Sequence, residues 1–167
     1  INSMKTVCIT GHRPAKLPWG YKTNGTEYMK YHKTLQKYIK HYIKLGYLNF
    51  ISGMALGVDM DFAEIVLEFK DKNKLITLEC AIPCLCQTKM WNKMQIVRYN
   101  NIIAHADKIT LVNDHYFSYC MLARNKYMVD CSDIVLAVWN GGKKGGTWQT
   151  IKYANSKNKK IDIIHID

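Results

Sequence analysis

The chain has 167 residues, 48% of them hydrophobic, and a formal net charge of +11 from 24 basic and 13 acidic residues. This length suits one domain with a buried core, and no apolar run approaches the roughly 18 to 20 residues of a membrane span, so we expect a single cytoplasmic domain over residues 4–167 with no membrane contact. The positive charge favours polyanionic partners over acidic ones. Residues 1–3 precede the first methionine and are interpreted as the remnant of an expression tag.

Short apolar runs alternate along the chain with segments of helical periodicity. The predicted strands cover residues 6–10, 49–52, 75–82, 108–112, 134–139 and 161–166, and the predicted helices cover 27–45, 58–70, 88–106, 119–131 and 147–156. This alternation predicts an α/β fold with a mainly parallel sheet and helices on both faces. Ligands of such sheets bind at the carboxyl ends of the strands, near the switch in strand order. The loops that follow the strands are therefore the candidate site.

The loop after the first predicted strand carries the first candidate residues. Gly11 permits a close backbone approach, and His12 and Arg13 follow it at the expected rim of the sheet. The long loop over residues 14–26 contains Trp19. This loop could fold over a ligand as a lid, or Trp19 could pin it onto the core.

Lysines recur at every third or fourth position of the first predicted helix, which indicates a solvated face, with a nucleic-acid stripe as the alternative. These residues are Lys30, Lys33, Lys37, Lys40 and Lys44. Against this lysine-rich background the arginines stand out, because the chain has only Arg13, Arg98 and Arg124. A guanidinium group binds phosphate or carboxylate through two parallel hydrogen bonds, which lysine cannot do. We expect at least two of the three to contact ligand or hold the site together, and ordinary ion pairing is the alternative.

The second predicted strand leads into a candidate phosphate loop. The strand ends at Gly53, and after Met54 a second glycine, Gly57, precedes the next predicted helix. Unpaired N–H groups and the positive end of a helix dipole at such a junction suit a phosphate. The alternative is a tight turn that needs a positive φ.

Carboxylates cluster at the start of the helix that follows, at Asp59, Asp61 and Glu64. A carboxylate pair can bind ribose hydroxyls, or it can stabilise or attack an anomeric carbon during glycosidic cleavage. Asp59 and Glu64 are therefore the candidate catalytic residues. In the alternative interpretation, Asp59 caps the helix and the other two carboxylates are solvated.

Aromatic residues near the later loops could stack on a nucleotide base. Trp91 lies two helical turns from Arg98 on one face, and Tyr116 follows the fourth predicted strand. Core packing plus an ion pair is the alternative for Trp91 and Arg98. The six cysteines lack the spacing of a zinc knuckle, so neither a metal nor another cofactor is expected.

Two further segments complete the expected rim. Arg124 and Asn125 lie early in the helix that leads into the fifth predicted strand. Gly145, Gly146 and Thr147 follow that strand and precede the last predicted helix, where the hydroxyl could cap the helix or donate to a phosphate. A flexible glycine turn is the alternative.

Four motifs stand in a fixed order along the chain. They are Ile-Thr-Gly-His-Arg-Pro at 9–14, Ser-Gly-Met-Ala-Leu-Gly-Val-Asp at 52–59, Arg-Asn-x-x-Met-Val-Asp at 124–130 and Gly-Gly-Thr at 145–147. This order resembles the YpsA-like branch of the SLOG superfamily, which also contains the DNA-processing protein DprA and the Lonely-guy phosphoribohydrolases. The resemblance implies a single Rossmann-like, doubly wound domain whose glycine loops bind nucleotides or nucleotide-derived ligands, and a homo-oligomer. Carried over by position, the implied pocket residues are Gly11, Arg13, Gly53, Gly57, Asp59, Gly145, Gly146 and Thr147.

One departure from the related enzymes concerns catalysis. The Lonely-guy enzymes carry a Gly-Gly-x-Gly-Thr-x-x-Glu motif whose glutamate serves hydrolysis of a nucleoside monophosphate. The corresponding position here, three residues after Thr147, is Thr150, which cannot act as a carboxylate. Any catalysis would therefore have to use Asp59, Asp61 or Glu64.

Three functions remain open from the sequence. The first is binding of an ADP-ribose-like or NAD-like ligand by a sensor or sequestering protein, with phosphates on residues 53–57 and 145–147 and with Arg13 and Arg124 bound to them. The second is a nucleotide N-glycosidase or a ribosyl-transferring enzyme. The third is single-stranded nucleic acid binding, which would weaken steeply with salt.

Overall fold

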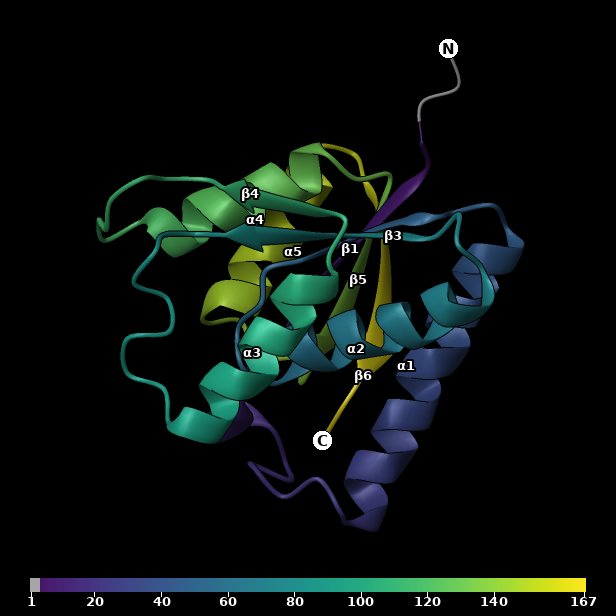
Figure 1. Cartoon of the computed structure of the whole chain (residues 1–167), viewed down its shortest axis with the longest axis horizontal. Coiled ribbons are helices and arrows are strands. Elements are labelled where there is room, and N and C mark those ends of the chain that lie inside the picture. The colour runs from purple at the N-terminus through teal and green to yellow at the C-terminus, as the bar shows by residue number, and fades with distance from the viewer. Residues whose placement is uncertain (1–3) are drawn as a thin grey trace.

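A computed structural model of the chain describes residues 4–167 (Figure 1), so the predicted tag remnant at 1–3 lies outside the described residues. The strands are β1 (Thr6–Gly11), β2 (Asn49–Ser52), β3 (Thr77–Ile82), β4 (Lys108–Leu111), β5 (Ile134–Trp139) and β6 (Lys160–His165). The helices are the short η1 (Pro14–Lys16), α1 (Thr26–Lys44), α2 (Val58–Lys72), α3 (Lys93–His105), α4 (Cys120–Asp130) and α5 (Gly146–Ser156).

The strands form one six-stranded sheet in the order β4-β3-β2-β1-β5-β6, and every neighbouring pair is parallel. Helices α1, α2 and α3 pack in a row on one face, and α4 packs beside α5 on the other (Figure 1). This arrangement confirms the predicted Rossmann-like, doubly wound fold. The chain leaves the adjacent strands β1 and β5 toward opposite faces, so their carboxyl ends form the topological switch point.

Both faces of the central strands are buried, which explains why they appear in the sequence as continuous apolar runs. In β1, Val7 and Ile9 belong to the large cluster under α1, α2 and α3, whereas Cys8 belongs to the smaller cluster under α4 and α5. In β5, Leu136 and Val135 divide in the same way. The alternation of side chains along each strand therefore supplies two separate cores.

One predicted helix begins later than expected. The prediction placed it over residues 88–106, but α3 begins at Lys93, because a capping box starts the helix after Asn92. The Asn92 side chain accepts from the Gln95 N–H at 2.9 Å, and the Gln95 side chain accepts from the Asn92 N–H at 3.0 Å. None of the helices in residues 4–167 is long and apolar enough to cross a membrane.

Candidate ligand-binding site

A cavity of about 340 Å³ lies at the switch point, and we call it the switch-point pocket. It is bounded by the carboxyl end of β1, the loop that follows, and the N-terminal parts of α2, α4 and α5. Its lining residues are Ile9, Thr10, Gly11, His12, Arg13, Ala15, Lys16, Ala55, Asp59, Met121, Arg124, Asn125, Met128, Gly146 and Thr147. The topology thus brings together residues from four segments that are far apart in the sequence.

Arg124 is the buried cation of this pocket, with only 4% of its surface exposed. Its Nε donates to Asn125 Oδ1 at 2.8 Å, and its Nη1 donates to the carbonyl oxygen of Gly53. Within residues 4–167, Nη2 donates to no protein acceptor, so this nitrogen is available to a ligand. Burial lowers the pKa of the guanidinium, because removal from water disfavours its charge. An anion bound in the pocket would stabilise the charge that burial disfavours.

Gly53 is the residue that makes room for this cation. A Cβ atom at Gly53 would lie 2.6 Å from both Cζ and Nη1 of Arg124, closer than any side chain tolerates. The φ of Gly53 is not in the left-handed region, so this position needs glycine for its lack of a side chain and not for its backbone conformation. Gly53 is not in the pocket lining, and its role in the structure is to position Arg124.

The N-terminus of α5 forms the opposite wall. Gly145 precedes the helix with a φ of 87°, and Gly146 and Thr147 open it and line the pocket. Thr147 is buried, and its hydroxyl has no hydrogen-bond partner within the described chain. A Cβ atom at Gly145 would lie 2.9 Å from Nζ of Lys16, so this lysine sits beside the helix N-terminus. Exposed Arg13 also lines the pocket, so three cations, Arg13, Lys16 and Arg124, share one lining.

His12 joins two walls of the pocket. It is buried, and its Nε2 accepts a hydrogen bond from the Asn140 N–H at 3.2 Å, which ties the end of β1 to the loop before α5. Burial, and then the charge of nearby Lys16, lower the pKa of the imidazole below its ordinary value. The neutral ring is the form that can accept this hydrogen bond.

Asp59 is the only carboxylate in the lining among the described residues. Its Oδ2 accepts from the Ala55 N–H at 3.2 Å. Burial raises the pKa of this carboxyl group, although the charges of Arg124 and Arg13 act in the opposite direction. The interpretation of Asp59 as a helix cap is wrong, because Gly57 occupies that position and Asp59 lies one residue inside α2.

The segment around Gly57 is mainly a tight turn. Gly57 has a φ of 94°, and a Cβ atom there would lie 2.7 Å from the carbonyl oxygen of His12. Met54 has a φ of 59° and is fully buried in the core. Only Ala55 and Asp59 of the predicted phosphate loop reach the lining. Gly11, at the end of β1, lines the pocket, and a Cβ atom there would collide with the side chain of Val58.

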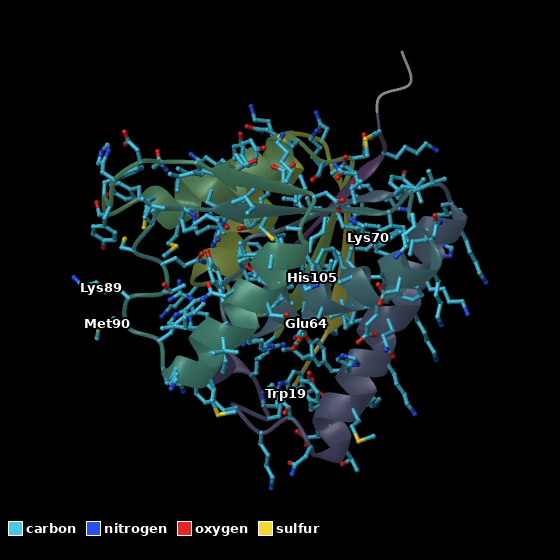
Figure 2. All side chains as sticks on the ribbon, viewed as in Figure 1. Trp19, Glu64, Lys70, Lys89, Met90 and His105 are labelled. Carbon is cyan, nitrogen blue, oxygen red and sulfur yellow. The ribbon has the colours of Figure 1, made fainter. Side chains whose placement is uncertain are left out.

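Glu64 and Asp61 belong to a separate network between α2 and α3. Arg98 Nε donates to Glu64 Oε1 at 2.7 Å, and its Nη2 donates to Asp61 Oδ1 at 2.8 Å. Figure 2 shows Glu64 between these two helices, and it does not line the switch-point pocket. Asp61 is 4% exposed and also accepts from the Tyr31 hydroxyl at 2.9 Å, so its interpretation as a solvated carboxylate is wrong.

The predicted aromatic contacts lie elsewhere. Trp19 stacks on Tyr31 with ring centroids 4.6 Å apart, so it pins the loop after β1 to the core. Trp91 packs edge-on against Tyr99 at 5.5 Å. Tyr116 is exposed on the loop before α4, and neither Trp91 nor Tyr116 lines the pocket. No Phe, Tyr or Trp of the described residues contributes to the lining.

Sequence reasoning missed Lys16 and the apolar part of the lining. Lys16 follows Arg13 by three residues in the short helix η1, but nothing distinguishes it in sequence from the many other lysines. Met121 and Met128 lie on α4, and both face the pocket. Their positions before and after Arg124, at helical spacing, were the available signal.

Thr150 occupies the position of the Lonely-guy glutamate. It is 2% exposed, and its hydroxyl donates to the carbonyl oxygen of Gly146 at 2.9 Å, one turn earlier in α5. The side chain is thus engaged within its own helix. It supplies no acid or base to the pocket.

Known proteins resemble this chain over most of its length. The family model described as the YspA SLOG family matches residues 7–167. A UPF0398 protein from Halalkalibacterium halodurans is 24% identical over 93% of this chain and 83% of its own length. UPF0398 proteins from Staphylococcus epidermidis and Bacillus thuringiensis are 23% and 26% identical, over 98% and 93% of this chain and 90% and 85% of their own lengths.

Solved structures share the fold. The DNA processing protein A from Streptococcus pneumoniae superposes with a TM-score of 0.67 at 15% identity over 98% of this chain. This chain spans about half of that protein, 51% of its length. The protein of the same name from Helicobacter pylori, described with its single-stranded DNA binding mode, gives 0.67 at 18% identity over 99% of this chain and 67% of its own length.

Proposed function

This chain belongs to the YspA SLOG family, and we propose that its switch-point pocket binds the phosphate groups of a nucleotide or nucleotide-derived ligand of the ADP-ribose or NAD type. The protein would act as a sensor of that ligand or sequester it. The observation that carries the proposal is that Arg13, Lys16 and buried Arg124 line one pocket together with the N-terminus of α5, beside which Lys16 lies. Such a helix end offers unpaired N–H groups and a positive dipole to an anion.

The polar groups around the pocket favour a phosphate over a carboxylate ligand. Arg124, Thr147 and the first residue of α5, Gly146, line the same pocket and carry guanidinium, hydroxyl and N–H donors, a set that suits the several oxygens of a phosphate. A volume of about 340 Å³ lies in the range of small-molecule sites. The base or ribose would then contact Ile9, Met121 and Met128, because aliphatic and thioether groups form the apolar part of the lining.

The test compares two arginines that receive the same substitution. Arg124→Lys keeps the charge but loses the planar guanidinium group that can form two parallel hydrogen bonds. We expect this change to weaken binding of ADP-ribose, NAD or a nucleoside phosphate by about tenfold or more. Arg98→Lys is the matched control, because Arg98 pairs with Asp61 and Glu64 outside the pocket. Isothermal titration of the wild type and both variants measures the difference. Absence of binding heat across the whole ligand panel would refute the proposal.

Glycosidic cleavage is a second candidate, favoured by one observation. Asp59 places a carboxyl group in the pocket with a raised pKa, as a group that stabilises or protonates a leaving base would need. Incubation with nucleotides should then release free base, and Asp59→Asn should abolish release while binding persists. Glu64→Gln serves as the matched control, because Glu64 lies outside the pocket.

Single-stranded nucleic acid is a further candidate ligand. The Helicobacter pylori neighbour is described by its single-stranded DNA binding mode, and the present chain carries a net charge of +11. A strand would present the same phosphate to Arg124 as a free nucleotide does. Affinity should fall steeply between about 50 and 200 mM salt if this candidate is correct.

A further inference from the structure

A second cavity opens beside the switch-point pocket, between α4 and α5, and we call it the α4–α5 groove. Its volume is about 360 Å³. Asn125 lines both cavities, and its Nδ2 would lie 4.0 Å from a Cβ atom at Gly146, so its amide stands at the boundary between them. The two cavities therefore adjoin at Asn125.

The groove is a basic surface. Lys126 and Lys152 line it, and none of its lining residues is acidic. Among residues 4–167, neither lysine forms an ion pair, in contrast to Lys70, which pairs with Asp107. The nearby carboxylate of Asp130 accepts a hydrogen bond from the Tyr153 hydroxyl at 2.7 Å, and the two exposed lysines still leave the groove attractive to an anion.

Aromatic rings lie among these lysines. The Lys126 and Lys157 ammonium groups lie 5.5 and 5.6 Å from the ring centroid of Tyr153, which itself lines the groove. The Lys152 ammonium group lies 5.8 Å from the ring of Trp148 on the preceding turn of α5. Cations alternating with aromatic faces suit a chain of phosphates and bases better than a single phosphate group.

We infer that the α4–α5 groove binds the continuation of a strand whose first nucleotide occupies the switch-point pocket, which selects a short single-stranded oligonucleotide among the candidate ligands of that pocket. Its next phosphates contact Lys126 and Lys152, and a base lies against Tyr153. This inference rests on the proposed phosphate pocket, because the first nucleotide is bound there. It adds a second subsite and a minimum ligand length of more than one nucleotide.

The test compares a nucleotide with a strand that contains it. Thymidine 5′-monophosphate, a 5′-phosphorylated thymidine tetramer and the corresponding uridine tetramer are titrated into the full chain by fluorescence anisotropy competition. We expect both tetramers to bind at least tenfold more tightly than the mononucleotide. A preference between the two tetramers distinguishes DNA from RNA as the natural strand.

Two double variants distinguish binding in the groove from a general effect of the protein's positive charge. Lys126→Ala with Lys152→Ala should reduce the tetramer-to-mononucleotide affinity ratio by about tenfold and lower the slope of log affinity against log salt by about 1.4. Lys33→Ala with Lys37→Ala removes the same charge from exposed positions of α1, on the opposite face of the sheet, and should change the ratio less than twofold.

The outcomes are distinguishable. If the mononucleotide binds and neither tetramer binds more tightly, the groove is not a second subsite, and the proposal for the switch-point pocket still stands. An equal loss of the ratio in both double variants also overturns the groove, since it indicates unspecific attraction. Failure of the mononucleotide and of both tetramers overturns the groove, and the proposed function itself fails only if ADP-ribose and NAD also do not bind.

Discussion

The contact between Gly53 and Arg124 makes a sharp prediction, because a single methyl group should disturb the cation of the pocket. In Gly53→Ala the new Cβ would lie 2.6 Å from Cζ and Nη1 of Arg124 and 2.9 Å from Nε. Arg124 is 4% exposed and its guanidinium group is bonded to the Gly53 carbonyl, so the group cannot move aside without losing that bond. Overpacking costs about 1–3 kcal/mol, and loss of a hydrogen bond to a charged group about 1.5–3 kcal/mol.

We therefore expect Gly53→Ala to lower the free energy of unfolding by about 2–5 kcal/mol. Urea denaturation followed by circular dichroism measures this loss, and titration with the tightest nucleotide ligand should show weaker binding. Gly25→Ala is the matched control, because no atom lies within 4 Å of the added Cβ and its φ is −87°. The control should cost less than about 1 kcal/mol.

A double-mutant cycle tests the cause. In an Arg124→Ala background there is no guanidinium group for the new methyl to meet, so Gly53→Ala should cost less than about 1 kcal/mol. An equal cost in both backgrounds would refute the reasoning, since the loss would then come from the Gly53 backbone and not from the contact with Arg124.

Two further predictions concern pH and the network outside the pocket. Because the pKa of His12 is lowered on folding, the unfolded chain takes up a proton first as the pH falls, so wild-type stability should decline below about pH 6.5. Urea denaturation between pH 7.5 and 5.0 should show a shallower decline in His12→Gln, and equal slopes would contradict this assignment. Asp61→Asn should lower stability by about 1–3 kcal/mol, because it weakens the partly exposed pair with Arg98. Nucleotide binding, measured by titration, should change less than twofold, and a larger loss would show that the network shapes the pocket.

Local sequence patterns were sufficient to predict the sheet. Buried parallel strands must be apolar on both faces, and the runs at 134–139 and 49–52 coincide with the observed strands. The start of α3 was also readable, because Asn92 and Gln95 have the spacing of a capping box, but the broader periodicity concealed it. Placement of the loops at one rim followed from topology alone.

The roles of individual residues were harder to predict. Arg98 and Arg124 look equivalent in sequence, yet one pairs with carboxylates between two helices and the other stands buried at the switch point. Glu64 and Asp59 are five residues apart on α2, which turns them toward different neighbours. Contact of any of these four residues with a ligand stays a prediction.

What the sequence determined by itself is the α/β architecture, the family and the rim on which a ligand would bind, because these depend on periodicity, strand order and short motifs. The tertiary structure decided what the glycines do. Gly57 serves a turn and Gly53 admits Arg124, whereas Gly11 and Gly146 are the glycines of residues 4–167 that line the pocket. The physical reason is that a glycine is required wherever another group approaches closely, and the sequence does not record whether that group is a ligand or the protein's own side chain.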